Sequence, residues 1–517
     1  MTTSLVSSLI MLDSNIVAVS LPAIGQSLHA NFAEIEWVIS AYLLAYAALL
    51  LAAGAFADIK GRKKSMVIGL FIFGIASACC GLAPSSAILN ISRAVQGVGG
   101  AMLLTAALAI ITNTFEGAER TRAFAVWGAC LGVALTAGPI LGGFITHYFG
   151  WRWVFLVNVP LCIILIFATF RVIKESSDPG ARKFDFLGIV TFTPGLFLIV
   201  WALIDGNDAG WTSTTILTRF AGAVIFVIAF IIVEKRQIRP MVDLKLFQNS
   251  TFLGSVYAMT GYGATAQVMV FYLPLFLQNA YGFEPAKAGL SMLPFALPMV
   301  LAPRLTGKLG AKFSGRTMLT AGLAVTLLGN LLFWLVAKSG LGFGYFTVSM
   351  LVAGTGAGIL NGETVKVLQG AVPPERAGMA SGLASTTRFI GILVGVAALG
   401  AVLSDTAKSK FAELAIPSGL KGDPLASAAK KVTSGDIPGM LKGVPPAIRD
   451  QVHQAAMHAY SAGFGLAALL AAGVSLIACV LTWHYVRSED TAPAVKSAAD
   501  KSRYEPHRKL IDCRHPI

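Results

Sequence analysis

The stretch LGVALTAGPILGG, residues 131–143, places four glycines and a proline inside an apolar segment that is long enough to cross a membrane. In a helix of a soluble protein each glycine costs roughly 1 kcal/mol relative to alanine, and an interior proline costs about 3 kcal/mol. Such a segment is therefore expected where close contact between helices offsets this cost, as it does in membrane proteins.

The composition of the whole chain supports the same class of protein. Hydrophobic residues make up 55% of the 517 residues and charged residues only 13%, whereas ordinary globular domains carry about 25% charged residues. Apolar runs of roughly 18 or more residues recur along the whole length, which is typical of membrane-spanning helices. The sequence therefore predicts an all-α protein that crosses the membrane many times.

Fourteen membrane spans are predicted from these apolar runs. They cover residues 4–25, 36–57, 65–83, 87–112, 123–145, 151–172, 187–205, 214–233, 251–279, 286–306, 317–337, 343–365, 378–403 and 458–486. The first run lacks both a preceding basic region and a small-residue cleavage site, so we expect it to remain as a span.

The orientation of the chain follows from its lysines and arginines. The loops after even-numbered spans, together with the C-terminal tail, hold 26 of the 40 basic residues, and the loops after odd-numbered spans hold 10. Because basic loops stay in the cytoplasm, we predict a multi-pass protein of the cell (inner) membrane with both termini cytoplasmic. The net charge of +14 is then explained by basic residues that set the orientation and attract anionic lipid, and it does not indicate a surface that binds nucleic acid.

Charge-rich linkers divide the chain. The stretches KESSDPGARKFD (174–185) and EKRQIRPMVDLKLFQN (234–249) enclose two spans that look inserted between two six-span halves. The halves also resemble each other weakly, because GAFADIKGRKK (54–64) and GKLGAKFSGR (307–316) each follow the second span of their half. Repeats of this kind are typical of transporters that work by alternating access.

Four parts are therefore predicted. They are an N-terminal six-helix bundle (1–175), two inserted central spans (186–235), a C-terminal six-helix bundle (250–487) with a long outer loop (404–457), and a cytoplasmic tail (488–517). The outer loop contains five prolines, and loops of this length are usually functional or disordered.

Four motifs, in order and at the right spans, resemble those of the major facilitator superfamily. LDSNIVAVSLP (12–22) is similar to the first-span motif of its fourteen-span drug:proton antiporters, with departures at Asn15, Ala18 and Ser20. GAFADIKGRKK resembles the family's loop after span 2, although Phe56 and Ile59 depart from it. LNISRAVQGVGGA (89–101) resembles its fourth-span motif, and LGVALTAGPILGG the fifth-span motif of its drug-exporting antiporters. The resemblance covers residues 1 to about 403 and the last span, and it implies the major facilitator fold with two additional central helices.

The resemblance also implies that the loop after span 2 is a gate on the cytoplasmic side. Gly54 precedes it, Asp58 directly follows the apolar run, Gly61 allows a turn, and Arg62 stands next to that glycine. A carboxylate here can pair with a basic group or a helix N-terminus of the other half and close that side. A solvated basic turn is the simpler alternative.

The fifth span carries the antiporter motif. Its matching residues are Gly132, Gly138, Pro139, Gly142 and Gly143. Gly128, Gly132 and Thr136 recur every four residues and predict a face that a neighbouring helix can approach closely. Pro139 removes a backbone hydrogen bond and is expected to bend the helix. We interpret the motif as a seal against leakage of protons and substrate, with ordinary close packing as the alternative.

Ionisable residues inside spans are costly and indicate functional sites. Asp13, Arg93, Glu363 and Arg388 are the candidates for coupling protons to substrate. A structural polar lock is the alternative for Asp13 and Arg93. Lys366 can simply neutralise Glu363, and Arg388 can serve to anchor helix packing.

We therefore predict a secondary active transporter that exports lipophilic, cationic drugs or toxic compounds in exchange for protons. An exporter of a natural metabolite and, less favoured, an uptake carrier are the alternatives. No cofactor, metal or catalytic site is expected, because no residues show the required spacing, which also disfavours a membrane-embedded enzyme. The sequence leaves open whether a periplasmic adaptor takes part and whether the natural start lies upstream of Met1.

Overall fold

The computed structural model describes residues 1–115, 117–177, 185–237, 240, 242–310, 312–372, 377–418, 420, 422–489 and 491. Within these ranges the chain is almost entirely helical and forms no β-strand. The first seven helices are α1 (Thr2–Leu28), α2 (Phe32–Lys60), α3 (Arg62–Gly81), α4 (Ser86–Thr114), α5 (Gly117–Tyr148), α6 (Arg152–Leu156) and α7 (Asn158–Val172). Two helices follow, α8 (Phe186–Ala209) and α9 (Thr214–Arg236).

The second half begins with the 3₁₀ turn η1 (Leu244–Gln248). Its membrane helices are α10 (Ser250–Gly261), α11 (Met269–Asn279), α12 (Pro285–Ser291), α13 (Leu293–Leu309), α14 (Gly315–Ser339), α15 (Phe343–Gly370), α16 (Ala377–Ala415) and α19 (Arg449–Tyr485). Between α16 and α19 lie η4 (Ile416–Ser418), α17 (Asp423–Thr433), α18 (Ile437–Lys442) and η5 (Pro446–Ile448).

The predicted all-α architecture with many membrane spans is confirmed. Thirteen helices in the described ranges are long and apolar enough to cross a membrane. The remaining predicted span, 251–279, is formed by α10 and α11 with the π-helical turn η2 (Tyr262–Gln267) between them. A π-helical turn inside a helix is rare and is frequently found at functional sites.

Local capping explains why the helices begin close to the predicted positions. At the start of α2, Asn31 and Glu34 each accept a hydrogen bond at 2.9 Å from the other's backbone N–H. This reciprocal arrangement satisfies backbone donors that the helix itself leaves free. Ser85, Ser213 and Ser314 accept a backbone hydrogen bond in the same way at the starts of α4, α9 and α14.

The outward faces of the helices are apolar, as a protein surrounded by lipid requires. Large exposed side chains include Phe71 on α3, Phe167 on α7 and Ile225 on α9. An apolar surface of this extent is rare on a soluble protein and is expected where lipid covers it.

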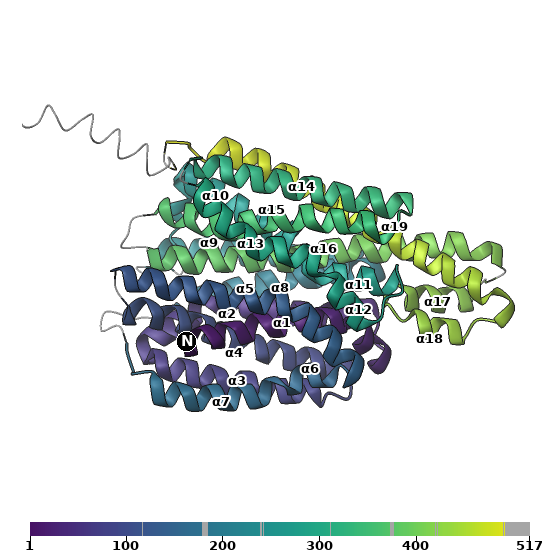
Figure 1. Ribbon diagram of the computed structural model, residues 1–517, viewed down its shortest axis with the longest axis horizontal. Coiled ribbons are helices and arrows are strands. Elements are labelled where there is room, and N and C mark those ends of the chain that lie inside the picture. The colour runs from purple at the N-terminus through teal and green to yellow at the C-terminus, as the bar shows by residue number, and fades with distance from the viewer. Residues whose placement is uncertain are drawn as a thin grey trace, which may run out of the picture.

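The helices run side by side, so their connections gather at two ends of the molecule (Figure 1). We call one of them the basic end, because the basic loop KGRKK (60–64) lies there together with the start of α1 and the end of α19. We call the other the cap end, because α17 and α18 lie there. Helices α1 to α7 form one side of the molecule, and α10 to α16 with α19 form the other, while α8 packs against both α2 and α16.

The segment 404–457 forms a helical cap. Helix α16 does not end at residue 403 but continues to Ala415, a length of 39 residues. At 1.5 Å per residue this is about 58 Å, nearly twice the hydrocarbon thickness of about 30 Å. A separate apolar cluster, which includes Phe411 and Val432, fills the space between α16, α17, α18 and α19. The predicted long outer loop thus contains helices that bury an apolar core of their own, and its position on the outer side of the membrane stays a prediction.

Candidate functional site

The structure brings Asp13 of α1 and Arg93 of α4 together in a buried ion pair. The Arg93 Nη1 donates to Asp13 Oδ2 at 2.7 Å, and both side chains are almost fully buried. The other carboxylate oxygen accepts from Gln96 Nε2 at 2.9 Å and from Asn158 Nδ2 at 2.7 Å. Three donors, one of them a cation, therefore compensate for the burial of this carboxylate.

Arg93 is itself held by neighbouring helices. Its Nε donates to the Val38 carbonyl of α2 at 2.9 Å, and its guanidinium carbon lies 4.2 Å from the ring centre of Tyr42. Gln96 accepts a second hydrogen bond from Arg93 at 2.6 Å and donates to Ser77 of α3 at 2.8 Å. Five helices, α1, α2, α3, α4 and α7, thus meet at this network, and the charge of Asp13 acts on all of them.

Sequence reasoning missed two members of this network. Asn158 begins α7 within the apolar stretch WRWVFLVNVP (151–160), and a single amide inside an apolar span was the available signal. Ser77 carried no comparable signal, because serine is common where membrane helices pack closely.

The glycines of the antiporter motif bring α5 into contact with α1. A Cβ at Gly138 would lie 2.5 Å from the Cβ of Asn15, and one at Gly142 would lie 2.7 Å from the Ile16 carbonyl oxygen. Real Cβ atoms do not approach so closely, so only glycine permits this packing within the first half.

The same motif also joins the two halves. A Cβ at Gly143 would overlap the Pro285 carbonyl of α12, and a Cβ at Gly289 of α12 would overlap the Pro139 carbonyl of α5. Backbone therefore meets backbone at this contact, which lies towards the cap end. Pro139 stands inside a helix that continues unbroken through it.

The predicted face of Gly128, Gly132 and Thr136 meets a neighbouring helix closely at Gly132 but not at Gly128. A Cβ at Gly128 would meet nothing within 4 Å. The Thr136 hydroxyl donates to the Gly132 carbonyl of its own helix at 3.1 Å, and Gly132 would place a Cβ 3.2 Å from Val300 of α13. The three later glycines make the tight contacts instead, because α5 approaches α1 and α12 most closely nearer the cap end.

Further contacts at the cap end join the halves. Gln278 Nε2 of α11 donates to the Val19 carbonyl of α1 at 2.9 Å. Asn207 Nδ2 of α8 donates to the Ala401 carbonyl of α16 at 2.6 Å. The inserted helix α8 is therefore tied to α16 of the second half.

At the basic end, Asp58 pairs within its own loop. Its Oδ1 accepts from Arg62 Nε at 3.1 Å and Nη2 at 2.9 Å. Gly61 has a φ of 110°, which disfavours other residues. The Glu175 carboxylate, which sequence reasoning missed, accepts two backbone N–H bonds of 3.0 and 3.1 Å at the start of α3. The loop is thus fixed within its own half.

The remaining predicted residues lie apart from Asp13. Glu363 of α15 is buried and pairs with Lys366 at 3.3 Å. Arg388 of α16 forms no ion pair with the described residues. Gly54 would place a Cβ 3.8 Å from Thr105, an ordinary contact. The structure therefore does not gather the four predicted coupling residues into one cluster.

Comparison with known proteins shows the family. The model described as "Major Facilitator Superfamily" matches residues 3–396. The chain belongs to this superfamily. It is 34% identical over 397 residues to "Multidrug resistance protein Stp" of Mycobacterium tuberculosis, covering 77% of this chain and 74% of that protein. It is 30% identical over 476 residues to "Multidrug efflux pump LfrA" of Mycolicibacterium smegmatis, covering 92% and 93%.

Solved structures show the same fold. A bacterial homologue of the human lysosomal transporter Spinster, in an inward-facing and unoccupied conformation, superposes with a TM-score of 0.64 at 15% identity, covering 95% of this chain and 97% of that one. The major facilitator fold implied by the sequence motifs is confirmed, and the chain is a membrane transporter rather than an enzyme.

Proposed function

We propose that this transporter exports lipophilic drugs or other toxic compounds in exchange for protons, with the basic end and both termini in the cytoplasm. The buried Asp13–Arg93 ion pair is the observation that carries the proposal. Ionisable groups inside the membrane are costly and usually mark a path for ions or substrate. The names of the relatives Stp and LfrA, which refer to multidrug resistance and efflux, support a drug substrate.

Asp13 binds the coupling proton. When the carboxylate is charged, Arg93, Gln96 and Asn158 hold α1, α4 and α7 together around it. When it takes up a proton, the ion pair is lost and Arg93 keeps only its neutral partners. The two protonation states therefore favour different packings of the first half, as a two-state carrier driven by protons requires.

The two ends act as alternating gates. The α5–α12 contact and the Gln278 hydrogen bond hold the cap end closed, whereas the only ion pair of Asp58 among the described residues is with Arg62 of its own loop. This arrangement fits the conformer that receives substrate from the cytoplasm. In the opposite conformer Asp58 pairs with the second half and closes the basic end, and Gly61 and Arg62 shape the loop for that contact.

A lipophilic cation fits this scheme because it favours the charged form of Asp13 and so releases the proton inward. Arg388 faces the substrate path from the second half. Glu363 provides a second negative charge for compounds that carry two positive charges. Membrane lipid supplies the route by which lipophilic compounds reach the protein.

Dye efflux tests the proposed function. The full-length protein is produced in cells that lack their own pumps, with cationic, neutral and anionic dyes and with or without an uncoupler. Efflux of cationic dyes that stops when the uncoupler is added is expected. Efflux that is unaffected by the uncoupler would contradict proton coupling.

Labelling tests the orientation. Ser427 on α17 is exposed, so a Ser427→Cys variant should react with an impermeant thiol reagent in intact cells. Replacement of the exposed Cys79 removes a competing site. Protection of residue 427, with reaction only after the cells are broken, would place the cap in the cytoplasm and overturn the topology.

A further inference from the structure

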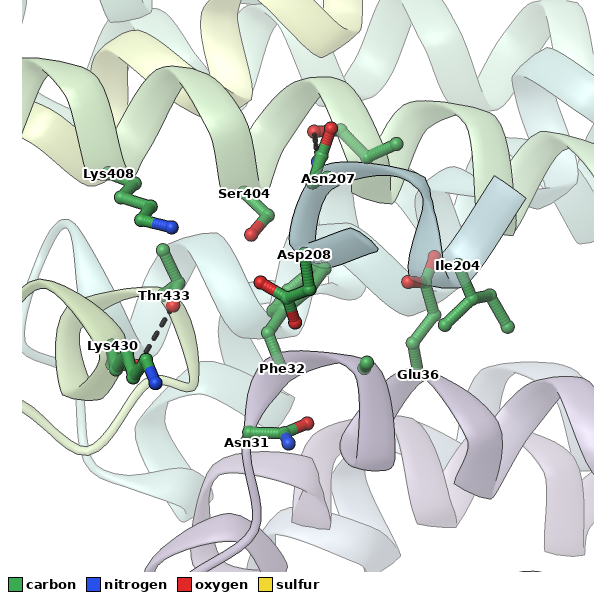
Figure 2. A pocket seen from close by; sticks show the side chains of 12 residues that line it. Asn31, Phe32, Glu36, Ile204, Asn207, Asp208, Ser404, Lys408, Lys430 and Thr433 are labelled. Atoms are coloured by element: carbon green, nitrogen blue, oxygen red, sulfur yellow. Dashed lines mark hydrogen bonds between the residues drawn. The ribbon is translucent and has the colours of Figure 1, made fainter. Parts of the chain in front are cut away.

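A second buried carboxylate, Glu36, lies between the two halves at the cap end. It belongs to α2 and is only 4% exposed. Figure 2 shows its side chain rising from α2 towards Ile204 of α8, at the inner side of a small cleft. Helix α2 belongs to the first half, α8 to the inserted pair, and α11 and α16 to the second half. Glu36 therefore stands where all three parts of the transporter meet.

Glu36 has one hydrogen-bond partner among the described residues. The Tyr272 hydroxyl of α11 lies 3.4 Å from Glu36 Oε1 and 2.5 Å from the Val396 carbonyl oxygen of α16. A backbone carbonyl only accepts, so the single phenolic proton is used by the shorter bond to Val396. The bond that the same hydroxyl donates to Glu36 Oε1 is therefore weak at 3.4 Å, and it leaves a charged carboxylate at this site poorly compensated.

Gly400 of α16 covers the same carboxyl group. A Cβ at this position would overlap Glu36 Oε1 and would lie 2.5 Å from the Tyr272 hydroxyl. The absence of a side chain lets the α16 backbone close directly over Glu36. The second half therefore covers Glu36 with backbone and with one phenol whose proton is shared with the Val396 carbonyl, and this compensates poorly for a buried negative charge.

Charged side chains near Glu36 line the cleft but do not pair with the Glu36 carboxyl group. The cleft is lined from α2, α8, α16 and α17 by Asn31, Phe32, Ala33, Ile204, Asn207, Asp208, Ala401, Ser404, Lys408, Lys430 and Thr433 (Figure 2). None of the ion pairs formed by the described residues includes Glu36. Glu34 on the same helix is engaged with Asn31, and Asp205 on α8 with Arg219. The α2 N-terminus favours a negative charge, but this effect is smaller than the penalty for burying an unpaired ion.

We propose that Glu36 is a gating residue that takes up a proton from the cap-end side before the cap end can close. When α2 separates from α11 and α16, Glu36 faces the cleft, where water and the ammonium groups of Lys408 and Lys430 favour the carboxylate. Closing then requires the carboxylate to bind a proton from the outer solution, because the closed arrangement has no partner for its charge. The proton returns to the same side on reopening, so Glu36 adds nothing to the number of protons carried per substrate.

This inference rests on the proposed alternating access but not on the drug substrate or on Asp13. It assigns the two carboxylates different tasks: Asp13 couples, and Glu36 sets the external pH at which the outer gate closes. Transport and gate closure can therefore be measured separately.

The test measures closure of the cap end against pH in the purified full-length protein in lipid nanodiscs. Spin labels replace Leu82, between α3 and α4, and Leu341, between α14 and α15, both of which are exposed at the cap end. The reference protein lacks the native cysteines and carries Asp13→Asn, so that Asp13 does not titrate. In this protein the distance between the two labels should lengthen as the pH rises, because Glu36 loses its proton and the cap end opens. Glu36→Gln should remain closed at every pH, and Glu36→Asp should keep a transition at a shifted pH.

Asp208→Asn is the matched control, because Asp208 is an exposed carboxylate in the same cleft. It should retain the transition. A Glu36→Gln protein with the unchanged transition would overturn the proposal, and so would loss of the transition in Asp208→Asn alone.

A second measurement separates this proposal from the proposed function. With Asp13 intact, Glu36→Gln should keep the wild-type ratio of protons to substrate in proteoliposomes, while its rate should depend less on external pH because only the loading of Asp13 still responds to it. A reduced ratio would make Glu36 a coupling site and overturn its gating role. If the wild type shows no proton-driven transport, the proposed function fails, whereas the label measurement still tests Glu36.

Discussion

Asp13 and Glu36 are both buried carboxylates of the first half, yet their surroundings are opposite. Asp13 accepts from Arg93, Gln96 and Asn158, all within that half. Glu36 meets a single phenol and the backbone of the second half. Burial alone therefore does not decide what a carboxylate does in a membrane. The number and charge of the donors around a carboxylate decide which of its protonation states the site stabilises. The helices that supply these donors are the ones whose packing changes when the carboxylate gains or loses a proton.

The largest expected effect is that of Asp13→Asn. Transport driven by a proton gradient should fall to background, because the remaining amide cannot exchange a proton. Removing one partner of a buried ion pair also destabilises a protein by about 3–5 kcal/mol, so the variant should melt at a lower temperature. Efflux from proteoliposomes and thermal unfolding measure the two effects.

A double variant separates structure from coupling. Asp13→Asn with Arg93→Gln removes both charges and should recover much of the lost stability without recovering transport. If the double variant regained proton-driven transport, Asp13 would be a structural lock and the coupling site would lie elsewhere.

A smaller effect is expected from Gly143→Ala at the α5–α12 contact. The added methyl group meets the Pro285 carbonyl, and overpacking of this kind costs roughly 1–3 kcal/mol. In the proposed gating scheme this contact forms only when the cap end is closed, so the ratio of closed to open protein should fall by about 5–150-fold. Distances between labels on the two halves at the cap end measure this ratio.

Gly128→Ala is the control in the same helix, because its new methyl group meets nothing within 4 Å. It should leave the ratio unchanged. Equal effects of the two substitutions would mean that helix propensity, and not contact between the halves, explains the glycines of α5.

The sequence predicted the fold well and the site in part. Apolar runs locate membrane helices because lipid forces every span to be helical and apolar, so the spans could be predicted from local composition. Asp13 and Arg93 could be named because charge is rare in such runs. Their direct pairing, and the bond that Asn158 donates to Asp13, depend on how three helices pack, which no local pattern specifies.

The failures have related physical causes. Glu36 was overlooked because it is only the fifth residue of α2, where the sequence looks like the polar end of a span. Its burial comes from α8 and α16, which are distant in sequence. The four-residue spacing in α5 predicted close packing along Gly128, Gly132 and Thr136, but Gly128 meets nothing within 4 Å, because a spacing within one helix does not say where another helix comes closest. The helices of the cap were not predicted, because its apolar residues lie in short segments that pack against one another and form no long apolar run.

Asp58→Asn should affect turnover more than stability. The Asp58 carboxylate is 37% exposed in its pair with Arg62, and pairs at such positions contribute roughly 0–1 kcal/mol. If Asp58 closes the basic end in the other conformer, the variant should cycle several-fold more slowly with unchanged substrate affinity. Binding and initial transport rates on the same preparation test this. A collapse of affinity with normal turnover would contradict a gating role.

The smallest effect is expected from Glu363→Gln, which extends the comparison to a third buried carboxylate. Glu363 resembles Asp13 in being paired with a cation, but its partner Lys366 is 61% exposed, whereas Arg93 is buried. When the charge at residue 363 is removed, Lys366 can turn into water and nothing is left unpaired. The free energy of unfolding should therefore change by less than about 1 kcal/mol, and export of singly charged compounds should be unchanged. Export of doubly charged compounds should fall if Glu363 supplies their second negative charge. Parallel efflux measurements with a singly and a doubly charged dye, and with Lys366→Gln as the matched variant, distinguish the two roles. Equal loss with both dyes would instead place Glu363 with Asp13 in the coupling step.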